Sequence, residues 1–165
     1  MLRLKVSGMT CDGCASAVKR AIGRVSSDAK VAVDLAGGEV GAGQFVKIMN
    51  NMILFQTGVA LAEALALARR NGVDPALLFD TLTKGSADSF ALRNHGLKAV
   101  LPGRFPLRSF SVRYAQKDLR YGLDLAEQVG IKVDAAHRVD HLFDAAVSAG
   151  MGDAYWPVIS QLPDA

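Results

Sequence analysis

Cysteine is scarce in this sequence: 2 of the 165 residues are cysteines, and both lie in one Cys-x-x-Cys motif, at Cys11 and Cys14. A fold held together by several disulfides is therefore excluded, and a chain of this length can bury a core without them. An excess of one charge is lacking too, since 19 Lys and Arg residues stand against 16 Asp and Glu residues. This near balance gives no broad positive field, so we expect no nucleic-acid partner.

Uninterrupted apolar runs are also missing. The N-terminal stretch MLRLKVSGMT is broken by Arg3 and Lys5, so it does not form the apolar core of a secretory signal, and we expect a cytoplasmic location. Residues 48–68 are apolar enough to suggest a membrane span. Polar side chains recur along this stretch, at Asn50, Asn51, Gln56, Thr57 and Glu63. Because amides and a carboxylate are costly to bury in lipid, the stretch predicts a central helix of a soluble core and no membrane partner.

The pattern of apolar residues divides the chain into two parts. LRLKVSG alternates like a strand, the residues from Cys11 to Arg24 have helical spacing, and KVAVDL alternates again before a Gly-Gly pair. In the rest of the chain, the apolar spacing and the helix-end signals predict helices at about residues 44–70, from 74 onward, and at 88–94, 112–129, 134–148 and 154–161. We therefore expect a mainly α protein, with a short βαβ segment in residues 1–40 and an all-helical domain in residues 41–165.

The Cys-x-x-Cys motif stands at the start of the first predicted helix. Free N–H groups and the positive end of the helix dipole favour thiolates there. Two thiolates without a histidine favour one soft ion, such as Cu(I) or Hg(II), over zinc, which takes four ligands. Two alternatives remain open: a relic loop whose cysteines hold no ligand, and a thioredoxin-like redox pair, although the aromatic and proline context of such pairs is absent.

The longer stretch GMTCDGCASAVKRAI resembles the metal loop of heavy-metal-associated domains, the small copper-chaperone and mercury-binding modules. The resemblance includes Met9, two residues before Cys11, and the helix that follows. It implies a ferredoxin-like βαββαβ unit, with Cys11 and Cys14 as the metal ligands. The likeness covers about residues 2–40 and ends at a third strand reduced to GEV, so we expect a truncated, partly ferredoxin-like module.

GEVGAGQFVKIMNN places Lys47 and Asn51 four residues apart, which puts both on one face of the predicted helix. A lysine held close to apolar surface exchanges its proton more easily, and a neighbouring amide can hold a hydroxyl or carboxylate. The spacing alone favours an exposed lysine and an asparagine that packs between helices over a catalytic pair.

From about residue 38 to residue 162 the chain resembles the C-terminal helical domain of the β-hydroxyacid dehydrogenases, the family of 3-hydroxyisobutyrate dehydrogenase. The resemblance rests on GAGQFVKIMNN, AEALALARRNGVDPALLFDTL, FSVRYAQKDLRYGLDLAEQVGI and AGMGDAYWPVI, in that order. It implies a fold like the C-terminal domain of 6-phosphogluconate dehydrogenase. It also implies Lys47 as the catalytic acid/base, Asn51 and Phe110 as substrate-binding residues, and Lys117 and Asp118 at the cofactor-facing edge of the site.

The dinucleotide-binding features of that family are not found in these 165 residues. No Gly-x-Gly-x-x-Gly turn follows a predicted strand, and the family's Ser-Gly-Gly substrate loop is absent. We therefore expect that NAD(P), the cofactor of the related enzymes, does not bind this chain alone, and that the chain alone does not turn over a small hydroxy acid or semialdehyde. The combination of two partial modules suggests a recombination product, natural or engineered. The resemblance also implies a homodimer formed through the long helices.

Two further features have less distinctive patterns. His137 and His141 lie four residues apart on a predicted helix with Asp140 between them, the spacing of a two-histidine metal site. Because no third ligand is nearby, we expect a surface or inter-helix packing role for them. After GMGD, where the dehydrogenases often have an acidic residue, this chain has Ala154, Tyr155 and Trp156, and Trp156 is expected to anchor the last helix.

Overall fold

The structure is a computed structural model that describes residues 4–5, 39–40 and 42–162. Two short strands, β1 (Leu4–Lys5) and β2 (Glu39–Val40), pair antiparallel, with Leu4 opposite Val40. They fall within the predicted strand LRLKVSG and the short GEV segment. The predicted helix from Cys11, the strand KVAVDL and the Cys-x-x-Cys motif lie outside the described residues.

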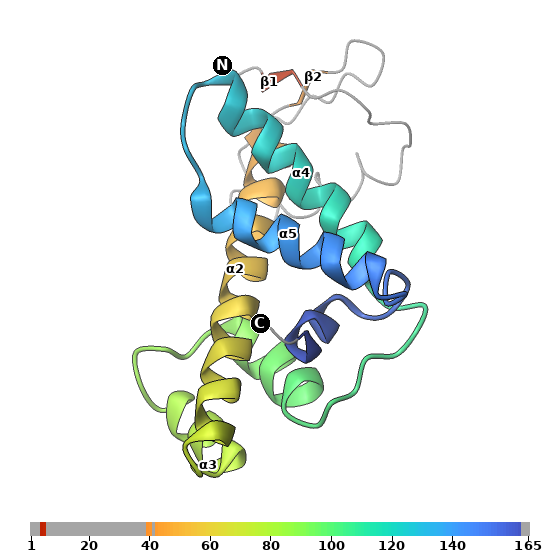
Figure 1. Cartoon of the computed structure of the whole chain (residues 1–165). Helices are drawn as coiled ribbons and strands as arrows, with labels where there is room; N and C mark the ends of the chain where they lie inside the picture. The colour runs from red at the N-terminus through yellow and green to blue at the C-terminus, as the bar shows by residue number, and fades with distance from the viewer. Residues whose placement is uncertain (1–3, 6–38, 41, 163–165) are drawn as a thin grey trace.

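The mainly helical fold class is confirmed. The helical elements are α2 (Ala42–Arg70), α3 (Pro75–Leu82), η1 (Leu92–Val100), α4 (Val112–Gln128), α5 (Asp134–Ser148) and η2 (Trp156–Gln161). The 29-residue helix α2 contacts every one of the others. Figure 1 shows α4 and α5 side by side across the upper half of α2, with α3 and η1 along its lower half. The long central helix thus carries two groups of shorter helices.

Local signals explain where several helices begin and end. Arg69 and Arg70 occupy the last turn of α2, and Gly72 follows with φ 71°, a left-handed conformation that glycine adopts without strain. The Asp74 side chain accepts a hydrogen bond of 2.9 Å from the Ala76 N–H and so caps α3, and proline follows at the first helical position. These helix boundaries were predicted correctly.

Two predicted helices differ from the structure. The helix expected at residues 88–94 is instead η1, a π-helix that begins at Leu92 and continues to Val100. Its middle residue, Gly96, packs so closely that a Cβ there would lie 3.0 Å from Phe79 Cε1, so packing against α3 decides its course. The last predicted helix is the shorter 3-10 helix η2, which starts only at Trp156, immediately before Pro157.

The main core lies where α2, α4, α5 and η2 meet. Trp156 and Phe55 are fully buried there, and their ring centroids are 5.1 Å apart. Gly58 on α2 makes room for the indole, because a Cβ on Gly58 would lie 2.4 Å from Trp156 Cη2. The anchoring role predicted for Trp156 is confirmed by this contact.

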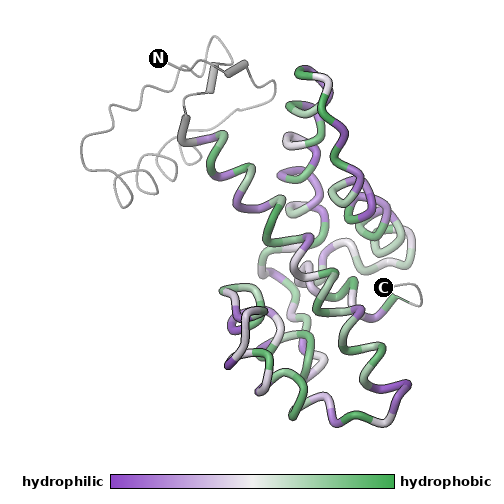
Figure 2. Tube along the Cα trace, turned by 90° about the vertical axis from the view of Figure 1, so that its left-hand side faces the viewer, coloured by the Kyte–Doolittle hydropathy of each residue, from purple (hydrophilic) through white to green (hydrophobic). Residues whose placement is uncertain are grey.

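Within the described part of the chain, one segment, the 27 residues Gln44–Arg70 of α2, is long and apolar enough to cross a membrane by length and composition. Figure 2 shows hydrophobic residues recurring along the whole helix with polar residues between them. In the structure this helix lies at the centre of the helical domain. The absence of a membrane partner stays a prediction.

Candidate functional site

The candidate site lies where the first half of α2 meets α4. Asn51 Nδ2 donates a 2.9 Å hydrogen bond to Asp118 Oδ2, and Lys47 Nζ lies 3.4 Å from the same oxygen. Asn51 and Asp118 are buried, whereas the Lys47 side chain is 33% exposed. The structure therefore brings together three of the predicted site residues, of which Lys47 alone has substantial access to solvent.

A small residue allows the two helices to approach at this point. Gly122 lies one turn after Asp118, and a Cβ on it would be 3.3 Å from Ile48 Cγ2 and 3.5 Å from Met52 Sδ. Ile48, the residue that follows Lys47 in the sequence, is buried. The close approach of α2 and α4 therefore explains how the short side chains of Asn51 and Asp118 reach each other.

The contact fixes the orientation of the Asn51 amide. Its NH2 group is engaged by Asp118, and its Oδ1 accepts a 3.2 Å hydrogen bond from the exposed Asn50 side chain. The Lys47 ammonium is attracted by the same buried carboxylate and has three N–H donors, so it can also face a ligand oxygen from the open side. An ammonium and an oriented amide together can bind an oxygen of a substrate hydroxyl or carboxylate.

Lys117 and Asp118 are consecutive in α4 and so point in different directions. Lys117 is exposed, and its Nζ lies 4.8 Å from the centre of the Tyr114 ring and 5.9 Å from that of Tyr121. The Lys117 cation can therefore face an anionic group such as a dinucleotide phosphate. Asp118 instead faces α2, and the cofactor-binding role assigned to it by the resemblance stays a prediction.

Phe110 lies just before α4 and packs against Phe55 of α2. It is partly buried, with its ring centroid 5.9 Å from that of Phe55 and 6.2 Å from that of Tyr114. Phe55 is one turn after Asn51 on α2, so Phe110 is linked to the Asn51–Asp118 pair through the Phe55 ring. This position suits the substrate-lining role predicted for it. Cys11 and Cys14 lie outside the described residues.

The sequence interpretation assigned no role to Gln44. This side chain is 3% exposed, and its Oε1 has no hydrogen-bond partner. It lies three residues before Lys47 and seven before Asn51, so all three share one side of α2. The spacing within GQFVKIMNN was the available signal, because a buried amide in line with two site residues extends the polar stripe of the site.

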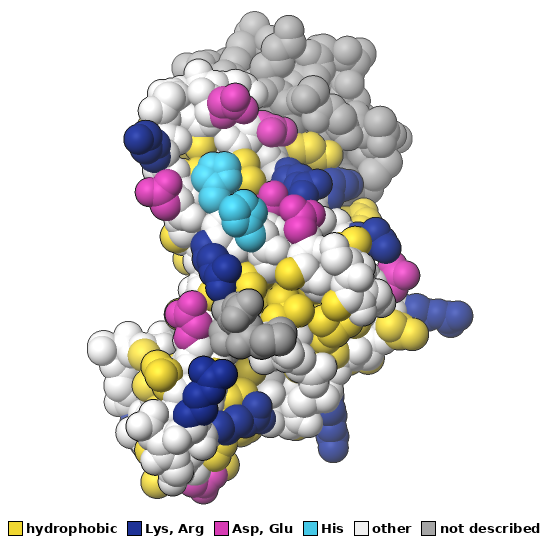
Figure 3. Space-filling view, in the orientation of Figure 1, with side chains coloured by type: hydrophobic (Ala, Val, Ile, Leu, Met, Phe, Trp, Pro, Cys, Tyr) yellow, Lys and Arg dark blue, Asp and Glu magenta, His cyan; other side chains and the backbone are white. Residues whose placement is uncertain are grey.

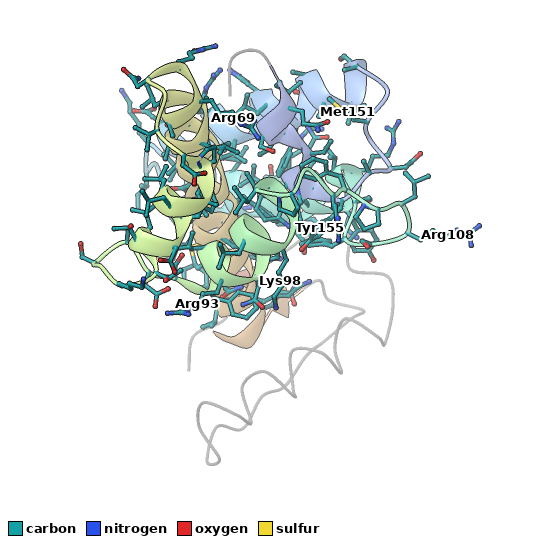
Figure 4. All side chains as sticks on the ribbon, turned by 90° about the horizontal axis from the view of Figure 1, so that it is seen from below. Arg69, Arg93, Lys98, Arg108, Met151 and Tyr155 are labelled. Atoms are coloured by element: carbon teal, nitrogen blue, oxygen red, sulfur yellow. The ribbon has the colours of Figure 1, made fainter. Side chains whose placement is uncertain are left out.

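A second polar contact joins η1 to the segment before η2. His95 Nδ1 and the Tyr155 hydroxyl are 2.5 Å apart, and the His95 ring centroid is 5.2 Å from that of Trp156. Figure 4 shows Tyr155 within the body of the domain, whereas Arg108 extends away from it. The sequence offered no signal for this pair, because its members are 60 residues apart.

Burial shifts the pKa values of both residues in this contact. It lowers the pKa of His95, which the nearby Lys98 ammonium lowers further, and it raises the pKa of Tyr155. Both shifts favour the neutral forms, which can share a hydrogen bond in a poorly solvated position.

The described residues differ in how they suit a metal ion and a dinucleotide cofactor. Among the residues that the structure describes, no three or more His, Cys, Asp or Glu side chains are grouped so that they could hold a metal ion. Lys117 is an exposed cation, and the Lys47 ammonium is partly exposed. The roles expected for them in cofactor binding and acid/base chemistry stay predictions.

The long central helix, whose Lys47 and Asn51 meet Asp118 of α4, belongs to a helical domain that matches solved structures of hydroxyacid dehydrogenases. Residues 41–156 match the family model described as NAD-binding of NADP-dependent 3-hydroxyisobutyrate dehydrogenase, and the chain belongs to this family. Residues 3–40 match the model of the heavy-metal-associated domain. Both predicted resemblances are confirmed.

Individual relatives agree with the family. The chain is 34% identical over 119 residues to chloroplastic glyoxylate/succinic semialdehyde reductase 2 of Arabidopsis thaliana, covering 70% of this chain and 32% of the relative. It is 35% identical over 120 residues to 3-hydroxyisobutyrate dehydrogenase of Pseudomonas aeruginosa, covering 68% and 39%. The crystal structure of 3-hydroxyisobutyrate dehydrogenase from Salmonella typhimurium matches with a TM-score of 0.68 and 29% identity, covering 74% and 42%. The chain thus spans about a third of the length of these curated relatives.

The lowered pKa of His95 predicts a pH-dependent stability. The unfolded chain binds a proton more tightly at this histidine than the folded chain does, so stability falls as the pH falls below about 6.5. Urea unfolding at pH of about 7.5 and about 5.5 should give a smaller difference for His95→Gln than for the wild type. Equal differences in the two proteins would contradict the assignment.

Proposed function

We propose that the helical part of this chain supplies the substrate-binding and acid/base side of an NAD(P)-dependent β-hydroxyacid dehydrogenase site, of the 3-hydroxyisobutyrate or semialdehyde reductase type. The observation that carries the proposal is the partly exposed Lys47 ammonium, 3.4 Å from the buried Asp118 carboxylate that also orients Asn51. The family and the relatives named above support this choice of reaction.

In the oxidative direction, Lys47 in its neutral form accepts the hydroxyl proton of a small hydroxy acid at Nζ. In reduction the ammonium returns that proton to the carbonyl oxygen. Bound NAD(P) would accept or supply the hydride at its nicotinamide ring. Asp118 holds Lys47 and Asn51 in place, Asn51 binds the substrate, and Phe110 limits the space beside it. Lys117 would face a phosphate of the cofactor.

This proposal requires a dinucleotide-binding surface opposite the α2–α4 face. The described residues contribute one accessible cation to it, Lys117, and the recognised dinucleotide turn is missing from the sequence. We therefore expect turnover only when such a surface is supplied, and none from the 165-residue chain alone.

The test joins residues 38–162 to the dinucleotide-binding domain of the Pseudomonas aeruginosa relative and measures NAD(P)-dependent oxidation of 3-hydroxyisobutyrate and related acids. Lys47→Met should lower kcat by about 10²–10⁴-fold, because positioned proton transfer contributes that much. Lys84→Met, at an exposed lysine in the turn after α3, should retain the activity. Equal turnover by the Lys47→Met and unsubstituted proteins would rule out the acid/base role.

We also propose that the chain forms a homodimer through α2. Residues Val46, Ile53, Ala60 and Leu67 recur every seven positions and are all exposed, with exposed fractions of 57%, 62% and 61% for Val46, Ile53 and Leu67. The alternate positions between them are Asn50, Thr57 and Ala64. This is the heptad spacing by which two helices pack, and the small residues at its centre permit close approach. The resulting face, here called the α2 seam, can pair with a second copy of itself.

Sedimentation of the Ile53→Glu chain tests this association. A charge at the centre of the α2 seam should convert the dimer to monomer, because it would be buried without a partner. Leu77→Glu is the matched control, since Leu77 is 61% exposed on α3 and lies outside the seam. If both variants sediment like the wild type, the dimer does not form through the seam.

A second candidate function is soft-metal binding by residues 3–40, which the match to the heavy-metal-associated model favours. We propose that Cys11 and Cys14 bind one Cu(I) or Hg(II) per chain, because two thiolates suffice for a soft ion. Anaerobic titration should show thiolate-to-metal absorption that is lost in the Cys11→Ser/Cys14→Ser chain. Identical curves for the two proteins would mean that the motif is a relic.

A further inference from the structure

The outward face of α5 carries two histidines. His137 and His141 are four residues apart in the helix, and both are exposed. Figure 3 shows histidine side chains on the open surface over α5, beside acidic and basic side chains. Of the two roles expected from the sequence, a surface position and a position between helices, the structure favours the surface. Their ring nitrogens are therefore accessible to an ion from solution.

The spacing is suitable for chelation. Side chains four residues apart on a helix have Cβ atoms about 5–6 Å apart, and two histidines at this spacing bind one metal ion in the His-Glu-x-x-His helices. Imidazole nitrogen suits Ni²⁺, Cu²⁺ and Zn²⁺ better than it suits hard ions such as Mg²⁺. Because the described residues contain no group of three or more such ligands, the two imidazoles are the protein ligands and water completes the coordination.

The rest of α5 holds these two positions rigidly. Its inner face is buried in the core through Ala136, Val139 and Phe143. Its side toward α4 is fixed by Arg120, whose Nε lies 3.0 Å from Asp140 Oδ1 and whose Nη2 lies 2.9 Å from Asp144 Oδ1. A fixed helix leaves only the imidazole rotamers to be ordered on binding, which lowers the entropic cost of chelation.

The charge nearby is compatible with a cation. The side chains on or beside this face of α5 include three carboxylates and two guanidinium groups. The carboxylates belong to Asp134, Asp140 and Asp144, and the guanidinium groups to Arg120 and Arg138. Asp140 and Asp144 are held by Arg120 and by the Gln116 amide, at 3.1 Å and 2.7 Å from Gln116 Nε2, so they contribute charge near the ion without acting as ligands.

We propose that His137 and His141 form an exchangeable two-histidine site for a borderline divalent ion, Ni²⁺, Cu²⁺ or Zn²⁺. This site is separate from the N-terminal thiols, which are expected to take soft ions. It uses neither Lys47 nor any other residue of the α2–α4 site, so it does not depend on the proposed dehydrogenase function.

Calorimetric titration with Ni²⁺ tests the proposal in the full-length Cys11→Ser/Cys14→Ser chain, where the thiols cannot contribute. One equivalent should bind. His137→Gln and His141→Gln should each weaken Ni²⁺ binding by at least about 10-fold, because losing even a group that only hydrogen-bonds to a metal ligand lowers the metal affinity by that factor. Circular dichroism of each variant should show unchanged helix content, because both positions are exposed.

A relocated pair provides the matched control. Adding Ala145→His to the His137→Gln chain restores the four-residue spacing one turn further along α5, at an exposed position, and should restore Ni²⁺ binding. The proposal is overturned if His137→Gln and His141→Gln each bind Ni²⁺ as tightly as their parent. It is also overturned if the parent without thiols binds no Ni²⁺.

Discussion

The buried carboxylate of Asp118 is the interaction on which the site depends. A carboxylate inside a protein must be paired or hydrogen-bonded, since burying it alone would cost several kcal/mol. Its two partners, Lys47 and Asn51, are one turn apart on α2, so satisfying the carboxylate fixes both the rotation of α2 and its contact with α4. The same contact turns Lys117 outward on the next position of α4.

The central helix links this site to the rest of the domain. Ile48 of α2 packs against Gly122 of α4, and Gly58 of α2 packs against the Trp156 ring. The exposed side of α2 carries the α2 seam. The two glycines allow approach distances that a Cβ would prevent, and each stands opposite a large side chain of the core. Site geometry, core packing and the proposed association are therefore properties of one helix.

Features set by neighbouring residues could be predicted from the sequence, and features set by distant partners could not. The Asp74 cap and the shared face of Lys47 and Asn51 follow from local spacing. The inward direction of Asp118 depends on a partner 67 residues away, and the contact of His95 with its partner spans 60 residues. The π-helix η1 was mispredicted for the same reason, because its course depends on packing against α3.

A double-mutant cycle between Asn51 and Asp118 tests the central claim most directly. The free energy of unfolding would be measured by urea denaturation for the wild type, Asn51→Ala, Asp118→Ala and the double variant. If the carboxylate holds the amide as described, the coupling energy should be about 1.5–3 kcal/mol, the range for a hydrogen bond to a charged group. A coupling energy near zero would contradict the account, because it would mean that the two side chains do not stabilise each other in the folded chain.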